Sequence, residues 1–394
     1  MHASSILRLR GLAAAGLPLL LALQPAAVSA QGSPASGAYV VRLGSDTIAV
    51  EEFTRTASAI RGRQVVRVPR TQLREYSGTL RPDGTLSRFE VSFRAPGDAQ
   101  PAMRGEVEFG ADSATVRVTR GDSTQSFRVA AAAGAIPLVA YSVGLYEVPL
   151  ARAVGARLDS LRVALVPVGN SAAVPSLVRR TGSGRYTVTN IAGMNQVRVD
   201  AQGRLLAWDG TASTLKVVTE RAARVPLDSL AAAFAARDQA GRGFGQASPR
   251  DSVLARVGDA TVSVNYGRPS LRGRPTSQLL PPGQVWRTGA NQATHFRTDR
   301  DLLIGGSRVP AGTYTLWTVP GPTEWTLILN RQTGQWGTVY DAAQDLVRIP
   351  MRVERAAQPA ETFAIAVEPQ GTGAVLALTW ADIRATVPVV VAGS

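Results

Sequence analysis

Residues 314–330 read YTLWTVPGPTEWTLILN, two apolar runs on either side of a Pro-Gly turn. In the second run Trp325, Leu327 and Leu329 are separated by single residues, so a strand would place them on one face. Proline and glycine at the centre of the stretch end the first run and favour a tight turn. The stretch therefore predicts two consecutive β-strands, each with one buried face.

The sequence around this stretch continues the two-residue period. Val347, Ile349, Met351 and Val353 alternate with charged residues in the same way. Eight candidate strands follow from such patterns, at residues 261–266, 293–298, 314–319, 325–330, 346–353, 363–367, 375–380 and 383–391. Short strands separated by Gly/Pro turns are typical of sandwiches and jelly rolls. We predict an all-β sandwich or jelly-roll-like domain over residues 251–394.

The preceding part of the chain, residues 39–238, also consists mostly of predicted strands. Residues 80–86 and 199–205 each place glycine in a short polar turn between alternating runs, as in β-hairpins. Residues 137–154 and 226–238 have the spacing and the terminal residues of helices. The combination predicts an antiparallel sheet with one or two covering helices.

Such a sheet has two possible uses for its concave face. It can curl around a lipid or another apolar ligand, or its own helix can fill the space, and we favour the second alternative. The arrangement is similar, in architecture only, to periplasmic lipoprotein-carrier folds.

The chain begins with the pattern of a secretory signal peptide over residues 1–30. Arg8 and Arg10 precede an apolar run at residues 11–23, and Val28-Ser29-Ala30 is a small-residue cleavage site. We expect an exported bacterial protein, periplasmic or extracellular, without a transmembrane span. A Gly/Ser/Pro-rich leader at residues 31–38 is predicted to be disordered, and a Gly-rich linker is predicted at residues 239–250.

Composition excludes several kinds of chemistry. The chain has no cysteine and only two histidines, His2 and His295, so disulfides, thiol nucleophiles and multi-histidine metal sites are not expected. We predict no metal and no cofactor. The formal net charge of +14 falls to +12 when residues 1–30, with two arginines and no acid, are removed. Because the arginines are dispersed and no nucleic-acid motif is present, we expect no nucleic-acid partner.

One stretch, residues 260–298, contains five arginines and no acid. Guanidinium groups match carboxylates and phosphates in a bidentate way, and a neighbouring aromatic ring offers a stacking face. We predict a site for an anionic or carbohydrate-like ligand, with the candidate residues Arg268, Arg272, Arg274, Trp286, Arg287, Asn291, Gln292, Thr294 and His295. The alternative is architectural: the arginines would bond loop carbonyls and pair with acids such as Asp341, Asp345 or Glu324.

A hydrolase acting on envelope or extracellular polymers is the second functional hypothesis. It would need His295, or carboxylates such as Asp299 and Asp341, to converge with a hydroxyl nucleophile. The sequence contains no G-x-S-x-G elbow, P-loop, H-E-x-x-H or EF-hand loop. We therefore favour a non-catalytic binding or structural module over an enzyme.

Four segments of the second domain resemble the bacterial domain-of-unknown-function family 2911. They are residues 264–274, 283–294, 309–317 and the stretch from Asn330 through Trp336-Gly337-Thr338. The resemblance implies the domain boundary and an exported bacterial setting, and it implies no mechanism. The family typically shows glutamate where this chain has Gln292, so an acid/base role of that glutamate in relatives would be missing here.

Overall fold

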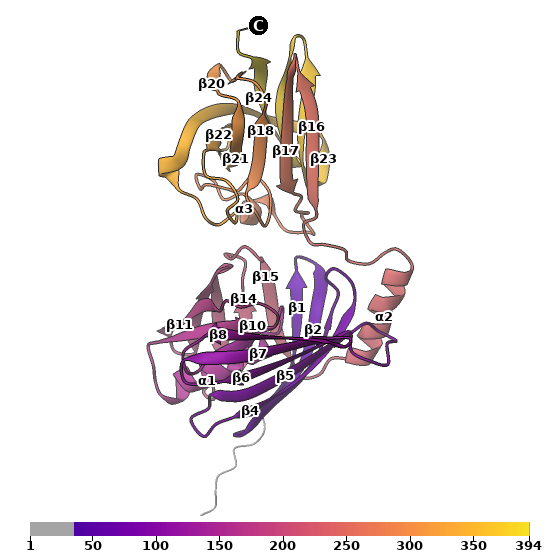
Figure 1. Cartoon of the computed structure of the whole chain (residues 1–394), viewed down its shortest axis with the longest axis vertical. Coiled ribbons are helices and arrows are strands. Elements are labelled where there is room, and N and C mark those ends of the chain that lie inside the picture. Colours follow the sequence, from indigo (N-terminus) through magenta and orange to yellow (C-terminus); the bar gives the residue numbers. More distant parts are fainter. Residues whose placement is uncertain (1–34, 394) are drawn as a thin grey trace, which may run out of the picture. The chain divides into compact units, whose positions relative to one another are not determined.

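The computed structural model describes residues 35–393, which form two β-sheets with few helices (Figure 1). The prediction of a mainly β protein is confirmed. The predicted signal peptide lies outside the described residues, as does the leader up to residue 34. None of the helices within residues 35–393 is long and apolar enough to cross a membrane.

The N-terminal sheet contains fifteen strands. Their bounds are β1 Ala35–Leu43, β2 Asp46–Arg55, β3 Ala59–Val66, β4 Gln72–Leu80, β5 Leu86–Arg94, β6 Met103–Phe109, β7 Ser113–Arg120, β8 Ser123–Ala130, β9 Ile136–Leu138, β10 Ser160–Pro167, β11 Val174–Gly182, β12 Arg185–Asn190, β13 Gly193–Val199, β14 Leu205–Asp209 and β15 Val217–Ala222. Strand β1 starts at Ala35, so residues 35–38, predicted as part of a disordered leader, belong to the sheet instead.

Except for β8 and β9, which lie at the two edges, strands that are consecutive in the sequence are neighbours in this sheet, and β1 and β15 meet in its middle. The order runs from β8 back to β1, continues from β1 to β15, and then descends from β15 to β9. All neighbours are antiparallel except β9 and β10. The two predicted hairpins are confirmed, since Leu80 pairs with Leu86 and Val199 with Leu205.

Three helical elements accompany the N-terminal sheet: η1 Gly144–Tyr146, α1 Glu147–Gly155 and α2 Leu227–Gln239. The prediction for α2 is confirmed, and its Leu227, Ala231 and Phe234 pack over β1–β4. The predicted helix at 137–154 is right only in its second half. Pro137 pairs with Val166 in the edge strand β9, where a residue without an N–H is tolerated.

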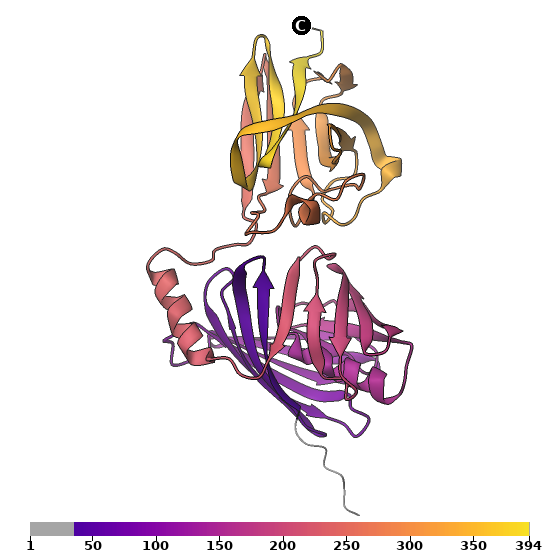
Figure 2. The same ribbon diagram turned by 180° about the vertical axis from the view of Figure 1, so that it is seen from behind.

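Helix α1 fills the space enclosed by the curved sheet (Figures 1 and 2). Val148, Leu150 and Ala153 of α1 are buried in the same core as Leu145 of η1 and inward residues of the strands, such as Phe89. The hypothesis that the concave face is packed by its own helix is therefore confirmed.

The C-terminal sheet has nine strands in the order β16-β17-β18-β21-β22-β23-β24-β19-β20. The elements of this part are β16 Arg250–Val257, β17 Ala260–Gly267, α3 Thr276–Leu279, β18 Thr294–Thr298, β19 Leu302–Ile304, β20 Ser307–Val309, β21 Gly312–Val319, β22 Glu324–Asn330, η2 Ala342–Gln344, β23 Asp345–Gln370 and β24 Gly373–Val391. Residues from all of these strands contribute to one core.

Two features of this sheet differ from the eight predicted strands. The pairs 346–353/363–367 and 375–380/383–391 are merged into two long strands, and Figure 2 shows the resulting bend. The register of β23 on β24 shifts between Arg355 and Ala364, so irregular residues interrupt the alternation there. Sequence reasoning also missed β16, β19 and β20, which are edge or three-residue strands with little periodic signal.

Candidate ligand site at one end of the C-terminal sheet

The candidate residues lie on β18 and on the loops beside it. One loop connects β17 to α3, a second connects α3 to β18, and a third, residues 331–341, follows β22. The second and third loops meet through a bridge between Gln292 and Trp336. Backbone hydrogen bonds from Ala293 to Gln335 and from Gly337 to Asn291 hold them together. The fold thus unites residues more than 40 positions apart in the sequence.

Arg268 and Arg274, from the acid-free stretch, are engaged in structural contacts. Arg268 donates to a carboxylate oxygen of Asp251 at 3.0 Å and to the carbonyl of Phe363 at 3.3 Å. Arg274 donates to the carbonyls of Leu271 at 2.8 Å and Ser270 at 2.5 Å. These contacts fit the architectural alternative, although the acid is Asp251 and not Asp341, Asp345 or Glu324.

The backbone of Arg272 is fixed by a contact with β23. Its N–H donates to a carboxylate oxygen of Glu361 at 2.7 Å, and Arg272 has a positive φ of 51°. Together with the bridge between Ser270 and Thr362, this contact ties the loop after β17 to the second half of β23. The loop is thus closely packed against the sheet.

Arg287 differs because its half-buried guanidinium has no carboxylate partner within residues 35–393. Its one side-chain hydrogen bond is a long one, 3.4 Å, to the carbonyl of Asn291. Burial lowers the pKa of Arg287 from its ordinary value. A cation that is withdrawn from water without a counter-ion is costly. Arg287 is therefore the arginine best suited to receive an anion.

The backbone around Arg287 is unusual. Thr288, Gly289 and Asn291 have φ values of 50°, 152° and 65°, and this region is uncommon for a β-branched residue such as Thr288. The turn is stabilised by the buried Thr294, whose hydroxyl donates to the carbonyl of Thr288 at 2.7 Å. Outliers of this kind concentrate at functional sites. Thr294 supports the turn from a fully buried position.

Trp286, predicted as the aromatic face of the site, lies in the core. Its side chain is 9% exposed, its ring stacks on Trp380 at 5.8 Å, and it meets Phe363 edge-on at 5.0 Å. Its backbone exchanges hydrogen bonds with Thr318. A ligand on the surface has no access to this indole.

The exposed aromatic residue beside the cluster is Trp336, which is 41% exposed. It lies opposite Gln292 in the bridge, which places the two side chains next to each other. A Cβ on the next residue, Gly337, would lie 2.6 Å from both the Arg287 side chain and the Asn291 carbonyl. Because Gly337 has no Cβ, the loop after β22 can come this close to Arg287 and Asn291. Sequence reasoning quoted Trp336 only for its family resemblance, and an exposed tryptophan has no periodic signal.

His295 is not arranged for hydrolysis. Its Nε2 accepts a hydrogen bond from the Gly334 N–H at 3.1 Å, and burial, followed by nearby Arg250, lowers its pKa. Within the described chain, no hydroxyl or carboxylate is hydrogen-bonded to it. Asp299 accepts from the Thr261 N–H, and Asp341 caps η2 through the Ala343 N–H. The groups that a hydrolase would need are engaged separately in local contacts.

The segments that build this site are those that carry the family resemblance. Residues 248–389 match the family described as protein of unknown function (DUF2911). The resemblance predicted from the sequence is thus confirmed for the C-terminal sheet. The DUF2911 description assigns no activity.

Comparisons of the whole chain add no function. No curated protein matches it. A DUF1089 family protein from Pseudomonas aeruginosa aligns at 14% identity and a TM-score of 0.32, over 43% of this chain and 92% of that protein. A β-barrel-like protein of the domain of unknown function DUF1849 from Brucella abortus aligns at 11% identity and a TM-score of 0.32, over 48% and 94%.

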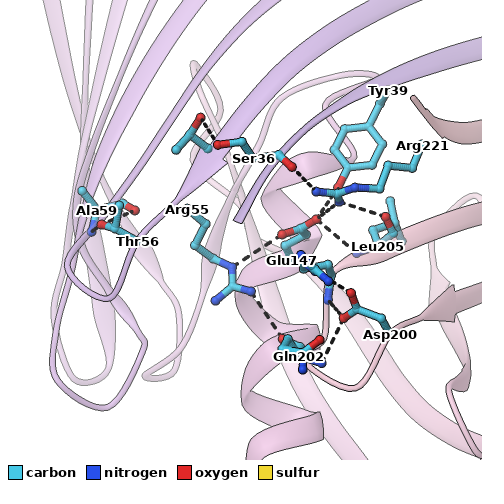
Figure 3. A network of polar contacts seen from close by, with 12 residues as sticks. Ser36, Tyr39, Arg55, Thr56, Ala59, Glu147, Asp200, Gln202, Leu205 and Arg221 are labelled. Carbon is cyan, nitrogen blue, oxygen red and sulfur yellow. Dashed lines mark hydrogen bonds and ion pairs between the residues drawn. The ribbon is translucent and has the colours of Figure 1, made fainter. Parts of the chain in front are cut away.

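A second cluster of chemically capable side chains, missed by sequence reasoning, lies inside the N-terminal sheet (Figure 3). Glu147, the first residue of α1, is completely buried and accepts hydrogen bonds from the Tyr39 hydroxyl, from Arg221 at 2.6 Å and from the Leu205 N–H at 3.1 Å. Arg55 pairs with it at 3.6 Å. One carboxylate thus connects α1 to four strands.

A neighbouring carboxylate, Glu51 of β2, is likewise fully buried. It accepts hydrogen bonds from the hydroxyls of Tyr76 and Ser142 and from the Gly144 N–H at 3.1 Å. A serine beside a carboxylate can suggest a nucleophile, but Glu51, Tyr76 and Ser142 are each at most 5% exposed. Because these side chains are buried, we interpret both carboxylates as structural.

The burial of Glu51 predicts a specific dependence of stability on pH. Desolvation raises its pKa above the ordinary value, so the folded protein keeps a proton that the unfolded chain has released. Stability should therefore fall as the pH rises from about 4.3, the ordinary glutamate pKa, through the raised folded value. Arg74, with a pKa of about 10, and Tyr76, with a pKa raised further above its usual range, do not titrate there.

Glu51→Gln isolates this effect, because it keeps the size of the side chain and removes its titration. Thermal unfolding of both proteins between pH 4 and 8 should show a flatter profile for the variant. Parallel profiles would contradict the assignment. Glu90→Gln, on an exposed side chain of β5, is the control and should follow the original protein.

Proposed function

We propose that this chain is an exported bacterial envelope protein, periplasmic or extracellular, and that it binds a ligand without catalysing a reaction. The ligand is anionic or sugar-like, and the site consists of Arg287, Asn291, Gln292 and the indole of Trp336. The observation that carries this proposal is a half-buried guanidinium without an acid partner beside an exposed tryptophan. The signal-peptide pattern of residues 1–30 supports export.

The chemistry of these groups indicates how each would act. The guanidinium offers parallel N–H donors to a carboxylate, sulfate or phosphate group. The exposed face of Trp336 offers an apolar contact to a sugar ring, and the amides of Asn291 and Gln292 can both donate to and accept from hydroxyls. Gln292 has no carboxylate to repel an anion, which fits an anionic ligand.

Calorimetry on the chain from residue 31 onward tests the proposal. The probes are oligogalacturonate for a uronic sugar, inorganic phosphate for the anion alone and cello-oligosaccharide for a neutral sugar. Arg287→Gln should weaken oligogalacturonate binding at least about tenfold, the value of one charge-assisted hydrogen bond. Trp336→Ala should weaken binding of oligogalacturonate but not of phosphate.

The matched control is Arg297→Gln, which removes an exposed arginine of β18 that lies in the same acid-free stretch. It should leave binding unchanged. If no probe binds, or if Arg287→Gln and Arg297→Gln behave alike, the cluster does not form a ligand site and its arginines order the loops.

A further inference from the structure

Strands β10 to β13 align a row of side chains on the face that points away from the core. The register aligns Arg162 with Leu177, Leu177 with Thr189, and Thr189 with Met194. Val163, Val178 and Val188, each next to a member of this row, lie in the core. Because successive side chains alternate between faces, the aligned row belongs to the opposite surface of the sheet.

A groove runs along this surface. It has a volume of about 620 Å³, within the range of sites for small molecules. Six of its ten lining residues are apolar, namely Ala132, Val163, Ala164, Pro175, Leu177 and Ile191. A second hollow of about 500 Å³ shares Ala132, Ala164 and Pro175 with it. The two hollows therefore form one elongated apolar trough, which we call the β10–β12 trough.

The trough lies beside large apolar side chains that are open to solvent. Ile191 is 64% exposed and lies in its lining, and Met194 is 44% exposed at the end of the aligned row. Large apolar side chains that are exposed beside a hollow mark a place where a ligand or a partner binds.

The two hollows of the trough differ in charge. Arg162 lines the larger one, is exposed, and has no hydrogen bond or ion pair from its side chain within residues 35–393. Asp112 lines the smaller one. An amphipathic anion would therefore place its charged group at Arg162 and its apolar chain along the larger hollow, away from Asp112.

The backbone in the trough does not suit a peptide strand. β11 and β12 are interior strands paired on both sides, and β10 pairs with β9 over Leu165–Pro167, so only Ser160–Ala164 have one open side. A peptide that binds by adding a strand needs a free edge. An apolar chain without hydrogen-bonding groups fits this lining better.

We propose that the β10–β12 trough binds one long-chain fatty acid, with its carboxylate at Arg162 and its alkyl chain over Ala164, Leu177 and Ile191. This site is separate from the proposed site of the C-terminal sheet and does not depend on it. No bond is made or broken. The carboxylate replaces water at a free guanidinium, and the alkyl chain covers exposed apolar surface.

Fluorescence titration with a 16-carbon fatty acid carrying an anthroyloxy label, followed by displacement with hexadecanoate or hexadecanol, tests the proposal on the chain from residue 31 onward. Arg162→Gln should weaken hexadecanoate roughly tenfold and leave hexadecanol unchanged. Leu177→Asp should abolish binding of both. Arg162 is exposed, so its loss does not endanger folding.

Arg198→Gln, an exposed arginine on β13 outside the trough, is the matched control and should bind hexadecanoate normally. The more conservative Ile191→Ser should weaken both ligands even if Leu177→Asp fails to fold. Failure of hexadecanoate to bind, or equal binding by Ile191→Ser, would overturn the proposal. So would a dimer of the unliganded protein in sedimentation that Ile191→Ser dissociates, because a second copy would then occupy the trough.

Discussion

Replacing Glu147 with alanine is expected to lower the free energy of unfolding of the N-terminal sheet by about 3–5 kcal/mol, the cost of breaking a buried ion pair from one side. The variant leaves Arg221, the Tyr39 hydroxyl and the Leu205 N–H without their acceptor. These groups lie on β15, β1 and β14, so the loss affects the junction between the two halves of the sheet. The effect is large because the site is buried, so water cannot take the place of the removed carboxylate as a hydrogen-bond acceptor.

Urea-dependent hydrogen exchange, followed by mass spectrometry, measures this loss locally. Peptides from β1, β14 and β15 should lose protection, and peptides from the C-terminal sheet should not. Glu147→Gln should lose less, since it keeps one acceptor oxygen. Glu108→Ala, at an exposed pair with Arg117, should cost at most about 1 kcal/mol. A Glu147→Ala variant as stable as Glu108→Ala would contradict the structural role of the buried network.

This network illustrates what a single sequence contains and what it conceals. Glu51 lies two residues before Phe53, and the two-residue period places both on the core face of β2. The pattern could therefore have indicated a buried acid. Its partners could not be foreseen, because Ser142 and Gly144 follow 91 and 93 positions later in the chain.

The fold class follows more directly from local pattern. Alternation is imposed by a sheet with one buried face, so the runs around Trp325 and Ile349 identify their strands. The signal weakens where that condition fails. Strand β16 is at an edge and buries only its last residue fully, and the middle of β23 changes register on β24. Such elements are defined by their neighbours in space.

The candidate ligand site could likewise be predicted only in part from the sequence. The sequence indicated Arg287, Asn291 and Gln292 correctly as neighbours, because one loop carries all three. It offered Trp286 as their aromatic partner for the same reason. A strand-like bridge to Thr318 turns Trp286 inward, and a separate loop brings Trp336 to the surface. Proximity in sequence does not determine which of two tryptophans faces solvent.

Trp286→Ala is accordingly expected to destabilise the C-terminal sheet by about 3–5 kcal/mol, the usual cost of deleting a buried aromatic side chain. The indole stacks on Trp380 and meets the edges of Phe363 and Trp325, so its removal leaves a cavity among three rings. Urea unfolding monitored by tryptophan fluorescence reports on this part of the chain, because five of the six tryptophans lie in the C-terminal sheet and its loops.

Trp336→Ala provides the matched comparison, since the same side chain is removed from the surface. It should change stability by no more than about 0.5 kcal/mol, as surface substitutions usually do. The expected effects on oligogalacturonate affinity are the reverse of those on stability. Trp286→Phe, which keeps a ring in the core, should bind oligogalacturonate normally. Trp336→Ala should bind it more weakly. If Trp286→Ala were as stable as Trp336→Ala, the core position of Trp286 would be refuted. Because stability and binding are measured on the same proteins, the role of each tryptophan is decided by which of the two quantities changes.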